Sequence, residues 1–136
     1  MASEAQVVIT VEADIVTARQ VARKAAIDAG FGPMDQSRIT TAVSELARNI
    51  VRYATGGKGD IVIRSIEGAG GGRGLEVTVK DQGPGIADID GAMRQGFSTG
   101  KGLGLGLGGT KRLMDEMQVE SELGVGTTIV VRKWAR

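Results

Sequence analysis

Apolar residues recur with two different spacings along this chain, and the spacing predicts where helices and strands lie. Residues 6–12 are rich in β-branched types and indicate a strand. Small apolar residues then return every three or four positions from Ile15 to Ala29, which predicts a helix that ends at the glycines after it. A second helix is predicted from Asp35 to about Ala54, because its apolar positions share one stripe.

The second half of the chain changes to the alternation of apolar and polar residues that is typical of strands. Residues 60–66 and 75–80 alternate in this way and predict an antiparallel hairpin, joined by the loop 68–74. Two more strands are predicted at 118–123 and 127–134, separated by a glycine turn.

Further helices are predicted near residues 89–94 and from about Thr110 to Met117, and Asp14 is placed to cap the first helix. Runs of helix and paired strands, without strict alternation of strand and helix, favour an α+β fold. We expect a two-layer α/β sandwich with a mixed, mostly antiparallel sheet. No repeat or linker interrupts the pattern, so residues 1–136 are expected to form a single domain.

Composition narrows the chemistry that is open to this domain. The 17 Lys and Arg nearly balance the 16 Asp and Glu, so no strong field draws the chain to nucleic acid or to a membrane. Without Cys or His, the chain has no disulfide, thiolate zinc site or imidazole base. No apolar run is long enough to span a bilayer, and residues 1–6 do not resemble a signal peptide. We therefore expect a cytoplasmic protein.

Glycine is unusually frequent in this chain, and most of it lies in one segment. Of 22 glycines, 15 lie between Gly68 and Gly109, which a packed core does not require. A GxGxxG pattern ends at Gly109, but it lacks the preceding strand and later acidic residue of a dinucleotide fold, and no P-loop motif occurs. Alternating leucines from Leu103 to Leu107, with a helix directly after them, favour a docking loop whose backbone N–H groups can bind phosphate.

Four short motifs stand in a fixed order on the predicted elements. They are Glu45xxxAsn49 on the second helix, Asp81xGly83xGly85 after a strand, the glycine run 102–109, and Gly124xGly126Thr127 between two strands. Together they resemble the N, G1, G2 and G3 boxes of the gyrase, Hsp90, histidine kinase and MutL (GHKL) ATPase superfamily. The resemblance implies a Bergerat-type sandwich, in which ATP lies between helices and sheet beneath a glycine-rich lid.

The candidate residues suit different parts of an ATP site. An amide oxygen suits Mg²⁺, which prefers oxygen ligands, so Asn49 is the expected magnesium ligand. Glu45, one turn earlier, is the expected catalytic residue; because a carboxylate is a weak base, its contribution is expected to be largely positional. The resemblance implies that Asp81 accepts a hydrogen bond from the adenine amine, and that Thr127 supports it directly or through water.

The remaining nucleotide-binding candidates flank these residues. Arg52 follows Asn49 by one turn, and Lys101 lies within the lid; each is either a phosphate contact or a solvated surface charge. Ile50 departs from the small Ala that is common in the superfamily, and is expected to tighten packing near the ribose. The other expected contacts come from Gly83, Gly85, Ile86, Gly102, Leu103, Gly104, Leu105, Gly106 and Leu107.

Within the superfamily, the chain is most similar to small protein kinases. It has no His to accept a phosphoryl group, as a sensor histidine kinase needs. At 136 residues we expect only the nucleotide-binding module, without the transducer domain of gyrase, MutL and Hsp90. Residues 38–50, 81–86, 96–99 and 110–117 resemble the RsbT-type switch kinases of the stressosome, and the similarity extends from about Asp14 to Trp134. The resemblance implies ATP-dependent phosphorylation of Ser or Thr on STAS-domain scaffold proteins, followed by activation of a PP2C-type phosphatase.

Two other functions remain open at this point. The first is an antisigma factor of the same fold, which sequesters a sigma subunit and phosphorylates its antagonist. The second is a nucleotide-gated interaction module in which catalysis is dispensable. An ATP-binding fold alone does not decide among these functions.

Overall fold

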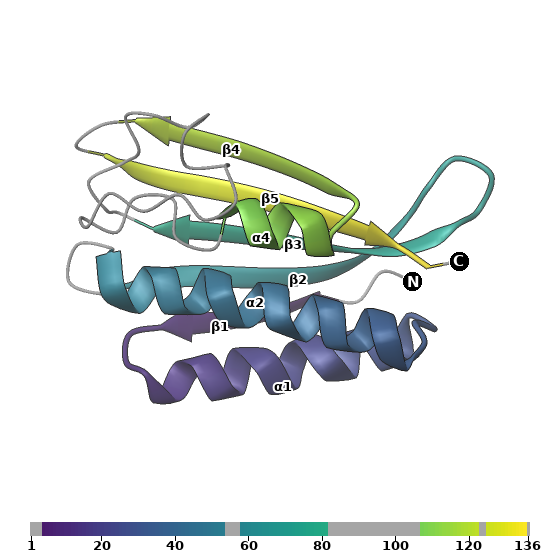
Figure 1. Ribbon diagram of the computed structural model, residues 1–136, viewed down its shortest axis with the longest axis horizontal. Coiled ribbons are helices and arrows are strands. Elements are labelled where there is room, and N and C mark those ends of the chain that lie inside the picture. Colours follow the sequence, from purple (N-terminus) through teal and green to yellow (C-terminus); the bar gives the residue numbers. More distant parts are fainter. Residues whose placement is uncertain (1–3, 54–57, 82–106, 123–124, 136) are drawn as a thin grey trace.

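One five-stranded sheet and three helices form two layers in the computed structural model (Figure 1), which describes residues 4–53, 58–81, 107–122 and 125–135. The elements are β1 (Glu4–Ile9), α1 (Ala13–Asp28), α2 (Pro33–Tyr53), β2 (Gly59–Glu67), β3 (Arg73–Asp81), α4 (Leu107–Leu113), β4 (Glu116–Glu122) and β5 (Gly126–Trp134). The spatial order of the strands is β1-β2-β3-β5-β4, and all four pairs are antiparallel. The expected α+β sandwich is confirmed.

The core lies between the sheet and the helices, which cover one face of the sheet (Figure 1). Alternate residues of the central strands, such as Val77 and Val79, are buried against the helices. On α1, Ala18, Ala22 and Ala26 are fully buried, and their short side chains let α1 pack closely on its neighbours. No helix among the described residues has an apolar stretch of the length that a bilayer span requires.

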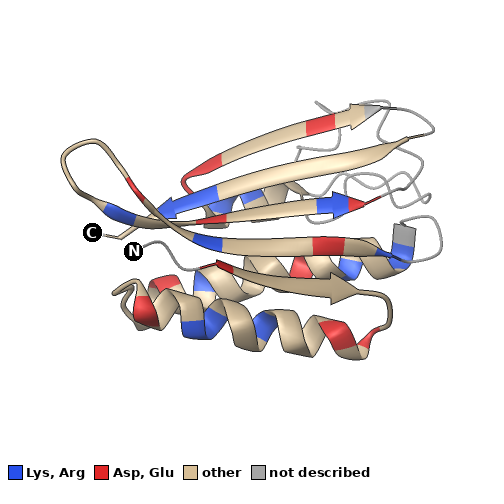
Figure 2. Ribbon diagram, turned by 180° about the vertical axis from the view of Figure 1, so that it is seen from behind, with Lys and Arg blue, Asp and Glu red and all other residues tan. Residues whose placement is uncertain are grey.

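The opposite face of the sheet carries none of the described helices (Figure 2), and charged side chains form ion pairs on it. Glu76 on β3 accepts hydrogen bonds from Arg64 at 2.7 Å and from Arg132 at 2.8 Å, and Arg132 also reaches Glu116 at 3.3 Å. The hydrogen bond to Glu76 raises the pKa of the Arg132 guanidinium above its ordinary value. This alternation of charge is typical of a sheet face exposed to water.

The first strand ends earlier than predicted, and Asp14 has a different role from the one expected. The helix α1 begins at Ala13, and Asp14 does not cap it; the predicted cap is wrong. Instead the Asp14 carboxylate accepts the N–H groups of Thr10 at 2.8 Å and Val11 at 3.0 Å. The hydrogen bond from the Thr10 N–H is the largest cause that lowers the pKa of Asp14. With these donors engaged, the strand ends at Ile9 instead of residue 12.

The helix predicted from Thr110 to Met117 is displaced in the same direction. The helix α4 covers Leu107–Leu113, and β4 already begins at Glu116. The Asp115 N–H donates to the Arg132 carbonyl at 2.9 Å, which starts the pairing of β4 with β5. Tertiary pairing therefore overrides the local helical pattern. The helix predicted at 89–94 lies outside the described residues.

A buried lysine ties together the end of the molecule where α4 stops. Lys133 is only 7% exposed, and its Nζ donates to the Leu113 carbonyl at 2.8 Å. The same nitrogen lies 3.8 Å from carboxylate oxygens of Asp35 on α2 and Asp115 before β4. This one side chain therefore joins β5 to the end of α4 and to the first turn of α2.

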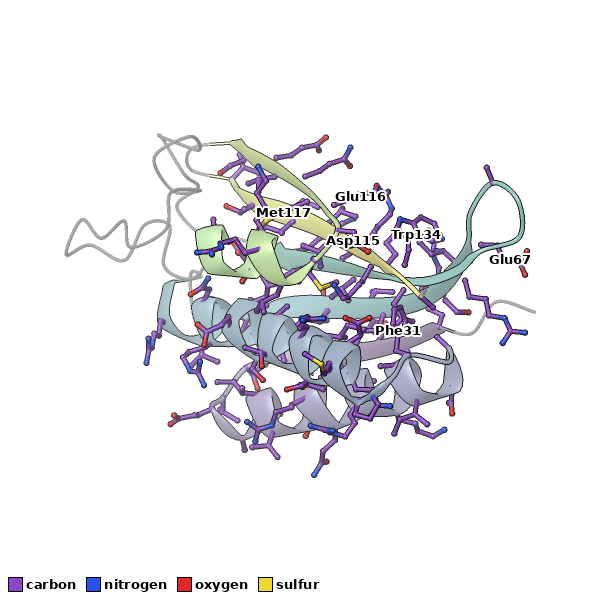
Figure 3. All side chains as sticks on the ribbon, turned by 45° about the vertical axis from the view of Figure 1, so that its right-hand side comes forward. Phe31, Glu67, Asp115, Glu116, Met117 and Trp134 are labelled. Atoms are coloured by element: carbon purple, nitrogen blue, oxygen red, sulfur yellow. The ribbon has the colours of Figure 1, made fainter. Side chains whose placement is uncertain are left out.

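The indole of Trp134 completes the same end of the sheet (Figure 3). Its Nε1–H donates to Glu116 at 2.6 Å, and its backbone N–H donates to Asp115 at 2.8 Å. A Cβ on Gly74 would lie 2.7 Å both from the ring and from the Lys133 carbonyl oxygen, so glycine is required there for the ring to approach the strand. We refer to Lys133, Trp134, Asp115 and Glu116 as the bonded end of the sheet.

Candidate functional site

The other end of the sheet carries a row of small and polar residues on four neighbouring strands. Asp81, the last residue of β3, pairs with Gly59 on β2 and with Thr127 on β5, and Thr127 pairs with Ser121 on β4. Asp81 and Thr127 each lie two residues from a core residue of the same strand, so they face the helices. We refer to Gly59, Asp81, Thr127 and Ser121 as the polar row.

Hydroxyl groups within the polar row are hydrogen bonded to one another. The Oγ atom of Ser121 lies 3.1 Å from Oγ1 of Thr127, and it also donates to the Gly126 carbonyl at 3.3 Å. Thr127 is 7% exposed, whereas Ser121 and Asp81 are half-buried. The row therefore combines a carboxylate and two ordered hydroxyls at the end of a hydrophobic core.

A cavity of about 770 Å³ opens beside this row. All four members of the polar row line it, and the lining continues around the end of the strands onto the helix-free face, with Val8, Asp60, Lys80, Glu120 and Thr128. Small-molecule sites are typically about 300–1,000 Å³ and combine apolar walls with a few placed polar groups. The cavity therefore has the size and the hydrogen-bonding groups that a nucleotide base requires.

The predicted catalytic residue Glu45 and the predicted magnesium ligand Asn49 both lie on α2. Glu45 and Asn49 are half-buried and one helical turn apart, as the spacing predicts. The Arg48 guanidinium donates to the Glu45 carboxylate at 2.6 Å, which fixes one oxygen of that group. Neither Glu45 nor Asn49 belongs to the described lining of the cavity beside the polar row.

The helix α2 nevertheless packs directly on the polar row through Ile50, the residue after Asn49. Ile50 is 1% exposed, and its methyl groups would lie 3.0 Å from a Cβ placed on Gly59. Only glycine at 59 allows this approach, since the same Cβ would also lie 2.6 Å from the Lys80 carbonyl. The larger Ile50 thus tightens packing at the join of α2 and the sheet. The structure does not test the expectation that this packing lies near a ribose.

The remaining predicted site residues fall into two groups. Arg52 is exposed near the end of α2, and Leu107 is 2% exposed as the first residue of α4, so its side chain belongs to the core. The others lie outside the described residues: Gly83, Gly85, Ile86, Lys101, Gly102, Leu103, Gly104, Leu105 and Gly106. The structure thus joins Asp81 with Thr127 and leaves the contribution of the glycine-rich segment a prediction.

Sequence reasoning missed Ser121 and Arg48. Arg48 follows Glu45 by three residues on one helix, a spacing that by itself indicates an ion pair. Ser121 had no comparable signal, because its neighbour Thr127 depends on the register between β4 and β5.

The oxygen ligands that the described residues offer are compatible with a magnesium ion held mainly by phosphate. Among the described residues, no group of three or more acidic side chains is arranged to hold a metal ion. Magnesium commonly binds one or two protein oxygens and completes its shell with phosphate oxygens and water. A single amide oxygen from Asn49 fits that mode of binding, whereas a dedicated carboxylate cage does not occur among these residues.

The chain belongs to the family of histidine kinase-, DNA gyrase B- and HSP90-like ATPases, whose family model matches residues 34–135. It is 55% identical to the serine/threonine-protein kinase RsbT of Bacillus subtilis (strain 168) over 128 residues, which cover 94% of each chain. It is also 37% identical to an anti-sigma F factor of Clostridium kluyveri over 98 residues, or 70% of this chain and 68% of that protein. The chain is a serine/threonine-protein kinase that uses ATP.

Solved structures show the same fold. The RsbU and RsbW domains of a Mycobacterium tuberculosis protein match with a TM-score of 0.64 at 21% identity, covering 100% of this chain and 33% of that one. The mycobacterial sensor histidine kinase MprB matches with a TM-score of 0.57 at 22% identity, covering 98% and 99%. At this level of identity the likeness extends to the fold alone.

Proposed function

We propose that this kinase phosphorylates a serine or threonine of a STAS-domain scaffold protein and then binds and activates a PP2C-type phosphatase. The observation that carries the proposal is the 55% identity to Bacillus subtilis RsbT across 94% of both chains. The resemblance to the stressosome switch kinases supplies the partner classes. The pathway would be a bacterial stress response that regulates a sigma factor, and the reaction would take place in the cytoplasm, where ATP is available.

The polar row is the proposed site for the adenine base. Asp81 offers a carboxylate, which only accepts hydrogen bonds, and the adenine amine only donates them. Thr127, its partner across the β3–β5 pair, adds a hydroxyl at the same level of the sheet. Both residues border the cavity of about 770 Å³ at this end of the sheet, which supports a ligand site here.

Glu45 is the proposed catalytic residue. In the transfer step, the oxygen of the partner's hydroxyl forms a bond to the γ-phosphorus, the bond from that phosphorus to the bridging oxygen of ADP breaks, and Glu45 accepts the hydroxyl proton. The ion pair with Arg48 at 2.6 Å holds the carboxylate in place and leaves its second oxygen for the incoming hydroxyl. The main contribution of Glu45 is therefore orientation.

Asn49 is the proposed magnesium ligand, and the cation would neutralise charge on the phosphate oxygens. Arg52 and Lys101 remain the candidate phosphate contacts, together with backbone N–H groups of residues 102–107 in the lid. Gly83, Gly85 and Ile86 are proposed to lie against the base. None of these contacts requires a side chain from the core.

A radiolabel transfer experiment tests the proposal. Purified kinase is incubated with γ-labelled ATP, Mg²⁺ and a STAS-domain scaffold, and the labelled hydroxyl is mapped by mass spectrometry. We expect label on one Ser or Thr of the scaffold with the wild type, and a transfer rate lower by about a hundred-fold or more with Glu45→Ala. Absence of transfer by a wild type that still binds ATP would favour a module in which catalysis is dispensable. That module is also favoured if Glu45→Ala still activates the phosphatase.

The second candidate function is an antisigma factor that also phosphorylates its antagonist. It is supported by the anti-sigma F factors among the relatives, including one at 37% identity. Affinity capture from a bacterial lysate separates the two functions. A retained sigma subunit, with no STAS scaffold or phosphatase, would favour the antisigma factor.

A further inference from the structure

The hydroxyl of Ser121 lies between two hydrogen-bonding groups, and only one of them can act as a donor. Its Oγ atom is 3.3 Å from the Gly126 carbonyl oxygen and 3.1 Å from Oγ1 of Thr127. A carbonyl oxygen accepts hydrogen bonds and never donates them, whereas each hydroxyl carries one proton. The three groups therefore constrain which way the two hydroxyl protons point.

Both contacts are satisfied at once by one arrangement of protons. In this arrangement Ser121 gives its proton to the Gly126 carbonyl, and the proton between the two hydroxyls comes from Thr127. Thr127 is 7% exposed, so bulk water offers little competition for this proton. With its proton directed at Ser121, Thr127 has only lone pairs to present to a ligand.

We propose that Ser121 is a positioning residue that makes the kinase selective for 6-aminopurine over 6-oxopurine nucleotides. It acts through Thr127, whose hydroxyl it holds as an acceptor beside the acceptor-only carboxylate of Asp81. An amine at purine C6 then meets acceptors, whereas a carbonyl oxygen there meets no donor from these two residues. A site that leaves a buried polar group unpaired discriminates strongly against that ligand. This inference rests on the proposed placement of the base at the polar row.

Binding of ADP and of inosine diphosphate tests the inference. The two ligands share the sugar and phosphates, and the inosine base replaces the C6 amine with a carbonyl and lacks the 2-amino group of guanine. In Ser121→Ala the Thr127 proton loses its acceptor and is free to turn toward the ligand. We define the selectivity ratio as the dissociation constant of inosine diphosphate divided by that of ADP. In Ser121→Ala this ratio should fall about five-fold or more, which corresponds to the free energy of one hydrogen bond.

Matched variants separate a change in proton direction from a general loss of structure. Ser121→Thr keeps the hydroxyl, so its ratio is expected to equal that of the wild type. Ser121→Cys is close to serine in volume and is expected to behave like Ser121→Ala, because a thiol is a weak hydrogen-bonding group. Ser65→Ala removes a hydroxyl from β2 near the opposite end of the sheet, and should leave the ratio unchanged.

The inference and the proposed function fail in different ways. If the wild type prefers ADP but both Ser121→Ala and Ser121→Cys keep the wild-type ratio, the role of Ser121 is wrong and the proposed site stands. If the wild type prefers ADP and Asp81→Asn does not alter ADP affinity, the placement of the base is wrong, and the inference falls with it. If the ratio falls in Ser121→Ala and Ser121→Cys but stays at the wild-type value in Ser121→Thr, the result supports both the role of Ser121 and the placement of the base.

Discussion

The two ends of one sheet differ in how their polar groups are used. At the bonded end, Lys133 and Trp134 engage carboxylates and a helix carbonyl at 2.6–2.8 Å. At the other end, the polar row lines a cavity of about 770 Å³. The same strands, β4 and β5, contribute to both ends. Stability and ligand binding are therefore expected to depend on different residues of the same strands.

The contacts that stabilise the sheet and the groups proposed to bind the base lie at opposite ends of the same strands. Lys133 joins α4 and α2 to the sheet at the bonded end, so the polar groups at the other end are not required for these contacts. Proteins commonly hold binding residues on a framework that is stabilised elsewhere. The predictions below change one end at a time and measure both activity and stability.

The largest effect is expected at Glu45. Replacement by Ala removes the carboxylate that positions the incoming hydroxyl, so kcat should fall about a hundred-fold or more, as for other groups that assist proton transfer. Thermal unfolding and ADP affinity should stay close to wild type, because only the half-exposed pair with Arg48 is lost. Steady-state phosphorylation of the scaffold and calorimetry measure these quantities.

A matched control for that variant is Glu67→Ala, at the exposed end of β2 near the hairpin loop (Figure 3). It removes the same side chain far from the site, and kcat should not change. Equal losses in the two variants would mean that Glu45 acts only through the overall charge of the protein.

Asp81→Asn is expected to weaken ADP binding. The amide replaces one acceptor oxygen by a donor, which opposes the adenine amine, and hydrogen bonds to charged groups contribute about 1.5–3 kcal/mol. Affinity should therefore fall about ten-fold to a hundred-fold. Titration calorimetry measures it, with Asp28→Asn at the end of α1, outside the cavity lining, as the control. An unaltered affinity would remove Asp81 from the base site.

At the bonded end, Lys133→Met is expected to reduce stability and leave ADP affinity within about three-fold. The variant leaves the Leu113 carbonyl without its donor and removes a cation near two carboxylates, and a buried unsatisfied group costs about 1–3 kcal/mol. Denaturant unfolding measures the loss. A parallel loss of ADP affinity would show that the two ends are coupled through α4.

Thr110→Val is expected to stabilise the protein slightly. Thr110 is 1% exposed, and its buried hydroxyl oxygen has no hydrogen-bond partner among the described residues. Valine has nearly the same shape, so replacing an unsatisfied hydroxyl by a methyl group should raise the free energy of unfolding by about 1 kcal/mol. The melting temperature reports it, and a lower Tm would mean that the hydroxyl is engaged.

The smallest effect concerns acid stability at the start of α1. Hydrogen bonds from Thr10 and Val11 lower the pKa of Asp14 below its ordinary value of 3.8, so the folded state favours the charged carboxylate. That stabilisation is present above pH 3.8 and is lost as the pH falls through the lower folded-state pKa. The Tm difference between wild type and Asp14→Asn should therefore shrink in acid. A constant difference would contradict this account.

The sequence allowed much of the fold to be predicted, because local patterns carry that information. Alternation identified the buried side of β3, and the stripe from Ile39 to Ile50 identified the core face of α2. The limits of α4 were predicted wrongly, because the pairing of residues 116–122 with β5 competes with their helical pattern. Such competition depends on a distant strand and has no local signal.

The candidate site was predictable only in part, for a related reason. The spacing of Glu45 and Asn49 depends on one helix, so the sequence alone predicts their common side. The neighbours of Asp81 are determined by a strand order in which β5 lies between β3 and β4. Neither the contact of Ser121 with Thr127 nor the packing of Ile50 on Gly59 follows from periodicity.

The most direct measurement is a crystal structure of the kinase with ADP and Mg²⁺. We predict that the adenine amine lies within hydrogen-bonding distance of the Asp81 carboxylate, beside Thr127, and that the Asn49 amide oxygen coordinates the metal. A nucleotide bound elsewhere, with Asp81 and Asn49 both remote from it, would contradict the central claim that these residues form one ATP site.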